Sequence, residues 1–156
     1  MFEHDPTLEN AIRFSRLDKQ HFFATVSNHS FQLEDRVWPT AEHYYQAHKF
    51  EGLPYEKIIL TANTGRQAHK AGNRWLKRKV HGWKDKRRLW MTRALYRKAL
   101  EYEQVKNALL ATNEALLIET SLYDHYWGIG RDQRGQNMLG KVWMDIRNKL
   151  QQSNTA

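Results

Sequence analysis

Apolar side chains recur at helical spacing in two long stretches of the chain. One stripe follows i, i+3, i+4, i+8 and i+11 and comprises Met91, Ala94, Leu95, Ala99 and Tyr102. A second stripe comprises Leu139, Val142, Trp143, Ile146 and Leu150. Such a stripe is typical of a helix that buries one face. The pattern therefore predicts a long helix from Asp85, a candidate N-cap, to about Tyr102, and a last helix capped by Asn137.

Shorter helices are predicted outside these two stripes. Thr40 is a suitable N-cap, and residues 41–50 contain no Gly, Pro or β-branched residue. Pro54 can begin another short helix that continues to about residue 62. Two more helices are predicted over residues 65–77 and 105–112.

Strand-like runs are few and lie mostly near the N-terminus. Ile12–Phe14, Phe22–Val26 and Phe31–Trp38 are short and rich in aromatic or β-branched residues. The last two are predicted to belong to a small antiparallel sheet, with Glu34–Arg36 as a turn. Leu116–Glu119 fits either a strand or a helix. The predicted fold class is mainly α (α+β), a single compact helical domain with a small N-terminal antiparallel sheet.

The composition is that of one cysteine-free domain. The chain has 156 residues, within the ~100–200 residues usual for one domain. We expect the domain to span residues 10–150 between loose termini at 1–9 and 151–156. The absence of Cys excludes disulfides, thiolate metal sites and a thiol nucleophile. No membrane-spanning run and no secretory signal are evident, so we expect a cytoplasmic protein without a membrane partner.

The positive charge is concentrated in one segment. The net charge is +8, but Lys70–Lys98 holds twelve basic residues and one acidic residue, Asp85, while the rest of the chain sums to −3. Such a segment indicates an anionic partner, such as nucleic acid or a phosphorylated metabolite. A solvated helix face explains a run of charges equally well.

A polar face is predicted on the helix that follows Thr40. Glu42, Tyr45, Gln46 and Lys49 lie at i, i+3, i+4 and i+7, so they share one side. The surrounding sequence is strongly aromatic. Two interpretations fit: an exposed ladder of salt bridges, or a partly buried polar ladder inside a pocket.

A second candidate site lies in the long loop from Ser121 to Gly135. Asp124–Gly130 places an Asp and a Trp beside two glycines, and Gly135–Gly140 follows. Glycine lets the backbone approach a ligand closely, and the indole of Trp127 offers a stacking face. The alternative is a structural loop with a buried Trp.

Several common chemistries lack their motifs. The two glycines at 128 and 130 do not complete a dinucleotide fingerprint, and there is no P-loop or zinc-protease motif. His43 and His48 are five residues apart, so they point in different directions on a helix. We therefore expect no metal site.

These motifs resemble the NADAR family, also called YbiA-like, over residues 12–150. The matching positions are Ser27-Asn28, Trp38–Phe50, Gly72–Arg74, Trp83 with Met91, Asp124–Gly130, and Gly135 through Met144 and Arg147. One departure is Lys98-Ala99, where the family pattern has Lys-Phe. Another is an extra residue between Gly72 and Arg74, which leaves Arg78 as an alternative to Arg74.

The resemblance implies an N-glycosidase that needs no cofactor. Family members hydrolyse the N–C1′ bond of phosphoribosylamino-pyrimidine intermediates of riboflavin biosynthesis, a form of metabolite damage control. Others remove ADP-ribose from guanine bases in nucleic acid. The expected partner is therefore a small phosphorylated ribosyl-heterocycle, with ADP-ribosylated nucleic acid as the alternative. A third interpretation is a non-enzymatic nucleic-acid-binding domain that uses the basic segment, and the oligomeric state is left open.

Glycosidic cleavage suggests roles for three residues. Positive charge develops on the ribose and negative charge on the leaving base, so a carboxylate and an acid are needed. We expect Glu42 to be the ribose-side carboxylate and Asp124 its partner. Lys49 suggests a second route, in which its amine attacks C1′ and forms an imine. Otherwise Lys49 pairs with Glu42 or contacts phosphate.

The remaining predictions concern substrate binding. Trp127 is expected to stack on the heterocycle or cover the ribose, and Asn28 and Gln46 to bind hydroxyls or base edges. Arg74 or Arg78 is expected to bind phosphate. The full set of predicted binding residues is Asn28, Trp38, Tyr45, Gln46, Arg74, Arg78, Trp127, Gly128 and Asn137.

Overall fold

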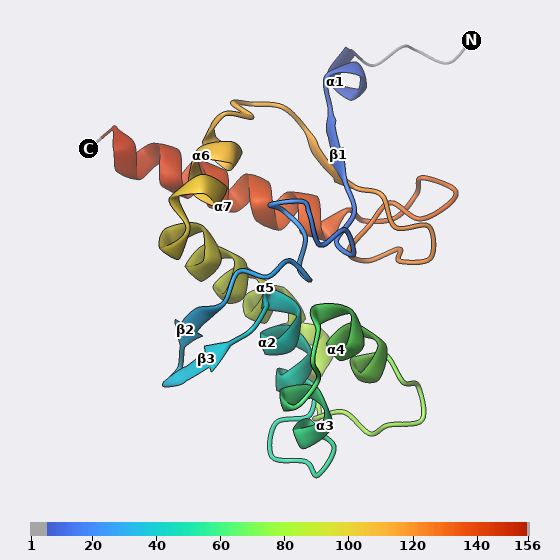
Figure 1. Ribbon diagram of the computed structural model, residues 1–156. Helices are drawn as coiled ribbons and strands as arrows, with labels where there is room; N and C mark the ends of the chain where they lie inside the picture. The colour runs from blue at the N-terminus through green and yellow to red at the C-terminus, as the bar shows by residue number, and fades with distance from the viewer. Residues whose placement is uncertain (1–5, 156) are drawn as a thin grey trace.

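A computed structural model of the chain describes residues 6–155 (Figure 1). The helices are α1 (Pro6–Glu9), α2 (Ala41–His48), α3 (Glu56–Leu60), α4 (Gly65–Gly72), α5 (Trp83–Glu101), α6 (Glu103–Leu110) and α7 (Met138–Asn154). The strands are β1 (Ile12–Phe14), β2 (Phe31–Leu33), β3 (Arg36–Trp38) and β4 (Leu117–Glu119). The predicted fold class, mainly helical with a small antiparallel sheet, is confirmed.

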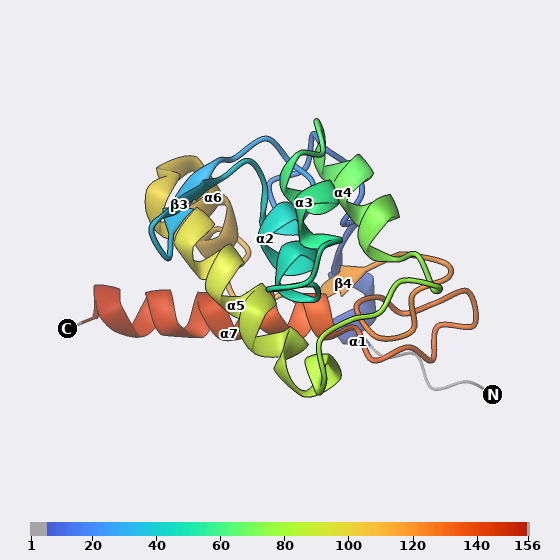
Figure 2. The ribbon, with the colours of Figure 1, turned by 90° about the horizontal axis from the view of Figure 1, so that it is seen from below.

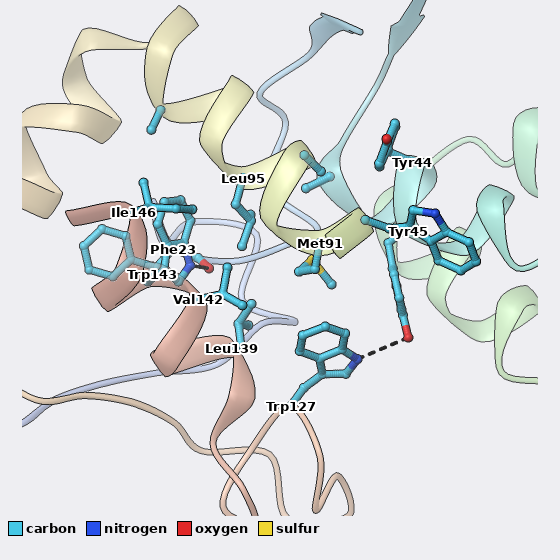
Figure 3. Close-up of a cluster of buried hydrophobic side chains, with 14 of the residues drawn as sticks. Phe23, Tyr44, Tyr45, Met91, Leu95, Trp127, Leu139, Val142, Trp143 and Ile146 are labelled. Carbon is cyan, nitrogen blue, oxygen red and sulfur yellow. Dashed lines mark hydrogen bonds between the residues drawn. The ribbon is translucent and has the colours of Figure 1, made fainter. Parts of the chain in front are cut away.

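The two predicted apolar stripes form the centre of the fold. α5 lies between α7 on one side and α2 on the other, and α3 and α4 cover the far side of α2 (Figures 1 and 2). Figure 3 shows Met91 and Leu95 of α5 between Val142 of α7 and Tyr45 of α2. All four side chains are buried. Burial of side chains of this size stabilises the fold by roughly 1.5–3 kcal/mol each.

The start of α2 follows from its cap. The Thr40 side chain accepts a hydrogen bond from the backbone N–H of His43, and Thr40 itself is extended. This satisfies one of the amide groups that a helix start leaves unpaired. The predicted N-cap is confirmed, and it sets where α2 begins.

The antiparallel sheet is a single hairpin of β2 and β3. Phe31 pairs with Trp38 and Leu33 with Arg36. Glu34 and Asp35 form the turn, with φ of 55° and 60°. Two successive residues at positive φ are typical of the turn whose twist matches a two-residue hairpin. The predicted turn therefore lies where expected.

The prediction of a strand at Phe22–Val26 is wrong. This segment has no regular structure and is held by the ammonium group of Lys98. The Lys98 Nζ donates to the carbonyl oxygens of Phe22 and Ala24, at 2.6 and 2.9 Å, and to Ser27 Oγ at 2.7 Å. The Ala24 N–H donates to the His21 carbonyl oxygen at 3.1 Å, so the chain turns at Phe22 and Phe23 and is not extended as a strand requires.

The ambiguous run before the long loop forms a strand in parallel with the N-terminal one. Ile12 pairs with Leu117 and Phe14 with Glu119. This two-stranded parallel pair was not predicted. It joins segments about 100 residues apart in the chain, with most of the helices between them (Figure 1).

Several predicted helix boundaries need correction. α4 ends at Gly72 rather than residue 77, and α3 begins at Glu56 rather than Pro54. α5 begins at Trp83 after Gly82, whose φ of 71° suits glycine, so Asp85 lies inside the helix and is not its cap. These boundaries depend on tertiary contacts more than on local sequence.

The ends of the chain only partly match the prediction of loose termini. Residues 1–5 and 156 of the predicted termini lie outside the described residues. α1 covers residues 6–9, and α7 continues beyond residue 150 to Asn154. The domain limits of 10–150 stay a prediction. None of the helices within residues 6–155 combines the length and apolarity that a bilayer crossing requires.

Candidate active site

The carboxylate of Glu42 lies at the centre of a buried polar cluster. Both of its oxygens bind Arg16 Nη2, at 2.8 and 2.7 Å, and Thr25 Oγ1 donates to Oε2. Gln46 Nε2 donates to Oε1 at 2.6 Å, and His69 Nδ1 lies 3.0 Å from the same oxygen. The Glu42 side chain has no exposed surface. The polar face of α2 is thus a buried ladder and not an exposed one.

The cluster keeps Glu42 ionised. Burial by itself raises the pKa of this carboxyl, but Arg16 and the hydrogen bond from His69 outweigh burial. The net result is a pKa held well below the usual range. A buried carboxylate that accepts from four side chains is an electrostatic anchor and not a proton donor.

Arg16 links the two carboxylates that the sequence predicted. It follows β1 directly and is 2% exposed. Besides binding Glu42, its Nη1 donates to Asp124 Oδ2 at 3.2 Å. The guanidinium also lies 5.9 Å from the ring centre of Tyr45 and 5.7 Å from that of Trp127. Glu42 and Asp124 raise the pKa of Arg16 despite its burial, so it stays charged.

Asp124 is oriented by its own loop. Its Oδ1 accepts from the backbone N–H of Tyr126 at 3.0 Å and of Trp127 at 2.7 Å. Oδ2 faces Arg16. The side chain is 28% exposed, so Asp124 is the accessible carboxylate of the pair. The structure therefore brings Glu42 and Asp124 together through one guanidinium.

A cleft of about 750 Å³ opens beside this cluster. Its wall includes Arg16, Arg66, His69, Asn73, Asp124 and Tyr126. Glu42 lies behind this wall, because Arg16 and His69 cover it. The volume is within the roughly 300–1,000 Å³ of sites that bind small ligands.

Lys49 directly follows the end of α2, one helical turn after Tyr45 and Gln46, and is buried. Its Nζ donates to Asn73 Oδ1 at 3.3 Å and lies 4.8 Å from the ring centres of both Tyr45 and Trp83. Burial lowers the pKa of Lys49 to about 7, although Glu42 acts to raise it. A large fraction of this amine is therefore unprotonated near neutral pH. Asn73 separates it from the cleft.

The aromatic residues expected to hold substrate are buried supports. Trp127 is 4% exposed and donates from Nε1 to the Tyr45 hydroxyl at 3.3 Å (Figure 3). The two rings meet edge to face. Together they form the surface on which the Arg16 guanidinium rests. Neither lines the cleft, whereas Tyr123 and Tyr126 do.

Gln46 is likewise internal. Gln46 is fully buried and packs against Gly72 of α4, where a Cβ atom would meet the Gln46 side chain. Its amide group orients Glu42. The close approach of α2 and α4 at this point is what brings His69 within reach of Glu42.

Trp38 lies on the opposite side of α2 from the cluster. Its Nε1 donates to the Leu33 carbonyl oxygen at 3.0 Å, and its ring packs on Tyr44 and His48. Residues 44 and 48 face away from residue 42 on a helix. Trp38 is therefore a core residue of the hairpin and does not border the cleft.

Three further predicted binding residues are exposed and do not line the cleft. Asn28 lies in the segment before β2, and Arg74 and Arg78 follow α4. Because α4 ends at Gly72, neither arginine continues the helix face that adjoins the cleft. Besides Arg16, the cleft is lined by Arg66, whose Nε donates to the Leu17 carbonyl oxygen at 3.1 Å.

Gly128 and Asn137 are structural residues around a buried carboxylate, Glu119. Glu119 accepts from the Arg16 backbone N–H at 2.9 Å and from Ser121 Oγ at 2.6 Å. A Cβ on Gly128 would meet Glu119 Oε2, so only glycine fits. Asn137 occupies the predicted N-cap position of α7, but its side chain makes no cap hydrogen bond. Instead it accepts from the Glu119 N–H and ties α7 to β4.

Sequence reasoning missed Arg16, His69 and Glu119. Arg16 has a signal in the predicted strand that precedes it, since polar residues at strand ends often reach a site. His69 has one in the small buried residues Ala68 and Gly72, which mark the packed face of α4. Glu119 ends the apolar run Leu116–Glu119, whose sequence fits either a strand or a helix.

The histidines of α2 are occupied by protein contacts. His43 lies between Thr40 Oγ1 at 2.8 Å and the Ala62 carbonyl oxygen at 2.9 Å. His48 contacts the Tyr44 carbonyl oxygen and Glu34. Among residues 6–155, no group of three His, Asp or Glu side chains is arranged to hold a metal ion.

Comparisons with known proteins agree with the sequence motifs. The NADAR domain model matches residues 2–151. An N-glycosidase of Nostoc punctiforme is 34% identical over 131 residues, covering 82% of this chain and 84% of its own length. A riboflavin biosynthesis protein of Vibrio vulnificus is 34% identical over 93% of this chain, which spans only 40% of that protein.

The structural comparison points the same way. The NMR structure of the Escherichia coli protein YbiA has a TM-score of 0.82 and 30% identity, covering 93% of this chain and 87% of its own. The E. coli protein is named an N-glycosidase and is 31% identical over 137 residues, covering 88% of this chain and 86% of its own length. The predicted family is confirmed: the chain belongs to the NADAR domain family.

Proposed function

We propose that the protein is an N-glycosidase that hydrolyses the N–C1′ bond of phosphoribosylamino-pyrimidine intermediates of riboflavin biosynthesis. The enzyme class agrees with relatives named N-glycosidase, which this chain matches over most of their length. The substrate class agrees with the relative named for riboflavin biosynthesis. The observation that carries the proposal is the convergence of Arg16, His69 and Asp124 on one cleft, around the buried Glu42.

The cleft offers a surface for each part of this substrate. Tyr123 and Tyr126 give aromatic faces for the pyrimidine, and Arg66 gives a cation for the phosphate. Asp124 is the exposed carboxylate at which positive charge on C1′ and O4′ is stabilised. Glu42 acts one layer further back, because it holds Arg16 and His69 in place. The substrate then contacts fewer of the residues predicted from sequence than expected.

Lys49 provides the nucleophile in one of two routes. Its unprotonated amine attacks C1′, the N–C1′ electron pair leaves with the base, and the opened ribose forms an imine. Water then hydrolyses the imine, so that one water is consumed overall. In the other route, water attacks C1′ directly. The lowered pKa of Lys49 supports the first route, which requires Asn73 to move aside.

The deciding experiment is a side-by-side assay of two substrates. Purified protein is given the phosphoribosylamino-pyrimidine and, separately, an ADP-ribosylated guanine oligonucleotide, and free base or free sugar is measured. We expect release from the first substrate. Release from the second alone would replace the riboflavin intermediate by the alternative substrate class. Release from neither would refute the glycosidase proposal.

Asp124→Asn tests the site itself. The Asn carbonyl can still accept from the Tyr126 and Trp127 amides, so the loop keeps its conformation while the charge is lost. We expect a rate loss of about 10²–10⁴-fold. Asp132→Asn is the matched control, because Asp132 is an exposed loop Asp whose Oδ1 also accepts a backbone N–H. Equal rates for the two variants would refute the role of Asp124.

Reduction with sodium borohydride separates the two routes. If Lys49 forms an imine, borohydride added during turnover converts it to a stable amine, and the protein gains the mass of the sugar phosphate. Peptide mass spectrometry then locates the adduct at Lys49. An active enzyme that gives no adduct indicates direct attack by water. The cytoplasmic location stays a prediction.

A further inference from the structure

We propose that His69 is the proton donor to the leaving base, a role that rests on the function proposed above. The inference begins with the two carboxylates. Glu42 accepts hydrogen bonds on both oxygens without exposure to the cleft. Asp124 accepts from two backbone amides and from Arg16. Carboxylates surrounded only by donors have no proton to give, so the acid must come from another group.

His69 presents an imidazole to the cleft beside this cluster. Its Nδ1 lies 3.0 Å from Glu42 Oε1, and because the carboxylate can only accept, Nδ1 carries a hydrogen. The His69 side chain is 25% exposed and lines the cleft. The ring edge that is turned away from Glu42 carries Nε2. Asn73 Nδ2 lies 3.4 Å from Nε2 and 3.3 Å from Nδ1, but its short hydrogen bond, 2.9 Å, goes to the His69 carbonyl oxygen, so this amide does not occupy Nε2.

The other histidines near the fold's centre lack this combination. His43 is 1% exposed and His48 8%, and protein atoms contact both ring nitrogens of each. His125 borders the cleft, but its Nε2 lies 3.3 Å from the exposed Asp132. Among the described histidines, His69 is the one held by a buried carboxylate with its opposite edge toward the cleft.

The proton step balances without a further reagent. As the N–C1′ bond breaks, its electron pair stays on the leaving nitrogen, which takes the proton from Nε2 of protonated His69. The neutral imidazole then accepts a proton from the water whose oxygen bonds to C1′. Glu42 stabilises the protonated ring throughout, since its pKa is held well below the usual range. The charged side chains around His69 are Glu42, which contacts its Nδ1, and Arg16, Arg66 and Asp124, which line the same cleft.

The test compares His69→Gln with His81→Gln. His81 is exposed and lies outside the cleft, so the control carries the same substitution without touching the site. We expect H69Q to lose about 10²-fold in kcat. The loss should be larger for substrates whose base leaves poorly, because these need the acid most.

Two further measurements separate chemistry from structure. Thermal unfolding of each variant reports whether the fold survives. In His69→Ala, added imidazole should restore at least tenfold of the lost rate, which a purely structural residue would not allow. An active wild-type enzyme whose H69Q variant stays within threefold overturns the role of His69 alone. Wild-type protein that acts on neither substrate overturns the proposed function itself.

Discussion

Two lysines are buried in this protein, and burial lowers the pKa of each to about 7. Their surroundings differ sharply. Lys98 of α5 donates to three oxygens of the segment before β2, which is the full capacity of an ammonium group. Lys49 of α2 has one amide oxygen, on Asn73, and otherwise faces the rings of Tyr45 and Trp83.

A lowered pKa therefore does not by itself identify a reactive lysine. Both amines lose hydration, but three acceptors occupy the Lys98 ammonium group, which is buried. The Lys49 ammonium group donates to one oxygen, that of Asn73, and Asn73 in turn lines the cleft. We therefore assign a structural role to Lys98 and a chemical role to Lys49.

The largest effect is expected for Lys49→Met. Without the amine, the imine route is closed, and we expect hydrolysis to fall on the order of 10³-fold. The unfolding temperature should change by only a few degrees, because Met fills the same apolar space between the rings. Product release and thermal unfolding are measured together. A loss smaller than tenfold would transfer the reaction to the water route.

For Lys98→Met we expect the opposite result, a loss of stability without a loss of activity. The segment at residues 22–27 loses its cation and buried carbonyl groups lose their donor, at about 1–3 kcal/mol for each unsatisfied group. We expect the free energy of unfolding to fall by about 3 kcal/mol in urea titrations. The molecules that remain folded should keep the wild-type kcat. A stable but inactive K98M variant would contradict the division between the two lysines.

The pH dependence of kcat/KM gives a third test. Only the unprotonated amine of Lys49 attacks C1′, so activity should rise with pH through about 7 and fall about tenfold per unit below it. The sign follows from the need for the unprotonated amine, and the position of the rise follows from the lowered pKa, since an unburied lysine would give the same rise near 10.4. The rise should persist in an active Lys98 variant. A profile without any rise near 7 would speak against Lys49 as the nucleophile.

The smallest effect concerns the single oxygen partner of Lys49. Asn73→Leu removes an acceptor that favours the ammonium form, so the pKa of Lys49 should fall further. A hydrogen bond of about 0.5–1.5 kcal/mol corresponds to roughly half to one pH unit. The rising part of the kcat/KM profile should move toward lower pH by that amount. A move toward higher pH would show that the amide does not stabilise the charge.

The sequence predicted the parts of the fold that repeat along the chain. The stripes of α5 and α7, the Thr40 cap and the polar face of α2 all depend on residues within one helix, and helical spacing makes them visible. The hairpin at Phe31–Trp38 is equally local. Glu42 and Asp124 came from motifs within short segments, and the structure connects them. Their roles remain proposals.

The rest depends on contacts between distant segments. Arg16 contacts Glu42 and Asp124 because β1 pairs with β4. A parallel pair of three residues per strand produces no periodicity from which it could be predicted. The prediction of a strand at Phe22–Val26 failed because Lys98 lies more than 70 residues away. The sequence predicts that Trp127 stacks on the substrate, but the ring is buried through its contact with Tyr45, a residue of another motif.

The β1–β4 pair also sets the order in which this protein can be assembled. It brings Arg16 to Glu119, 103 positions further along the chain, and to Asp124, 108 positions further along. Closing so long a loop carries a large entropic cost that local helix contacts do not. During synthesis α2, α4 and α5 can meet early, while Arg16 waits for the loop before α7 to emerge. The site therefore forms only after residues 117–124 have been synthesised, however early the helices fold.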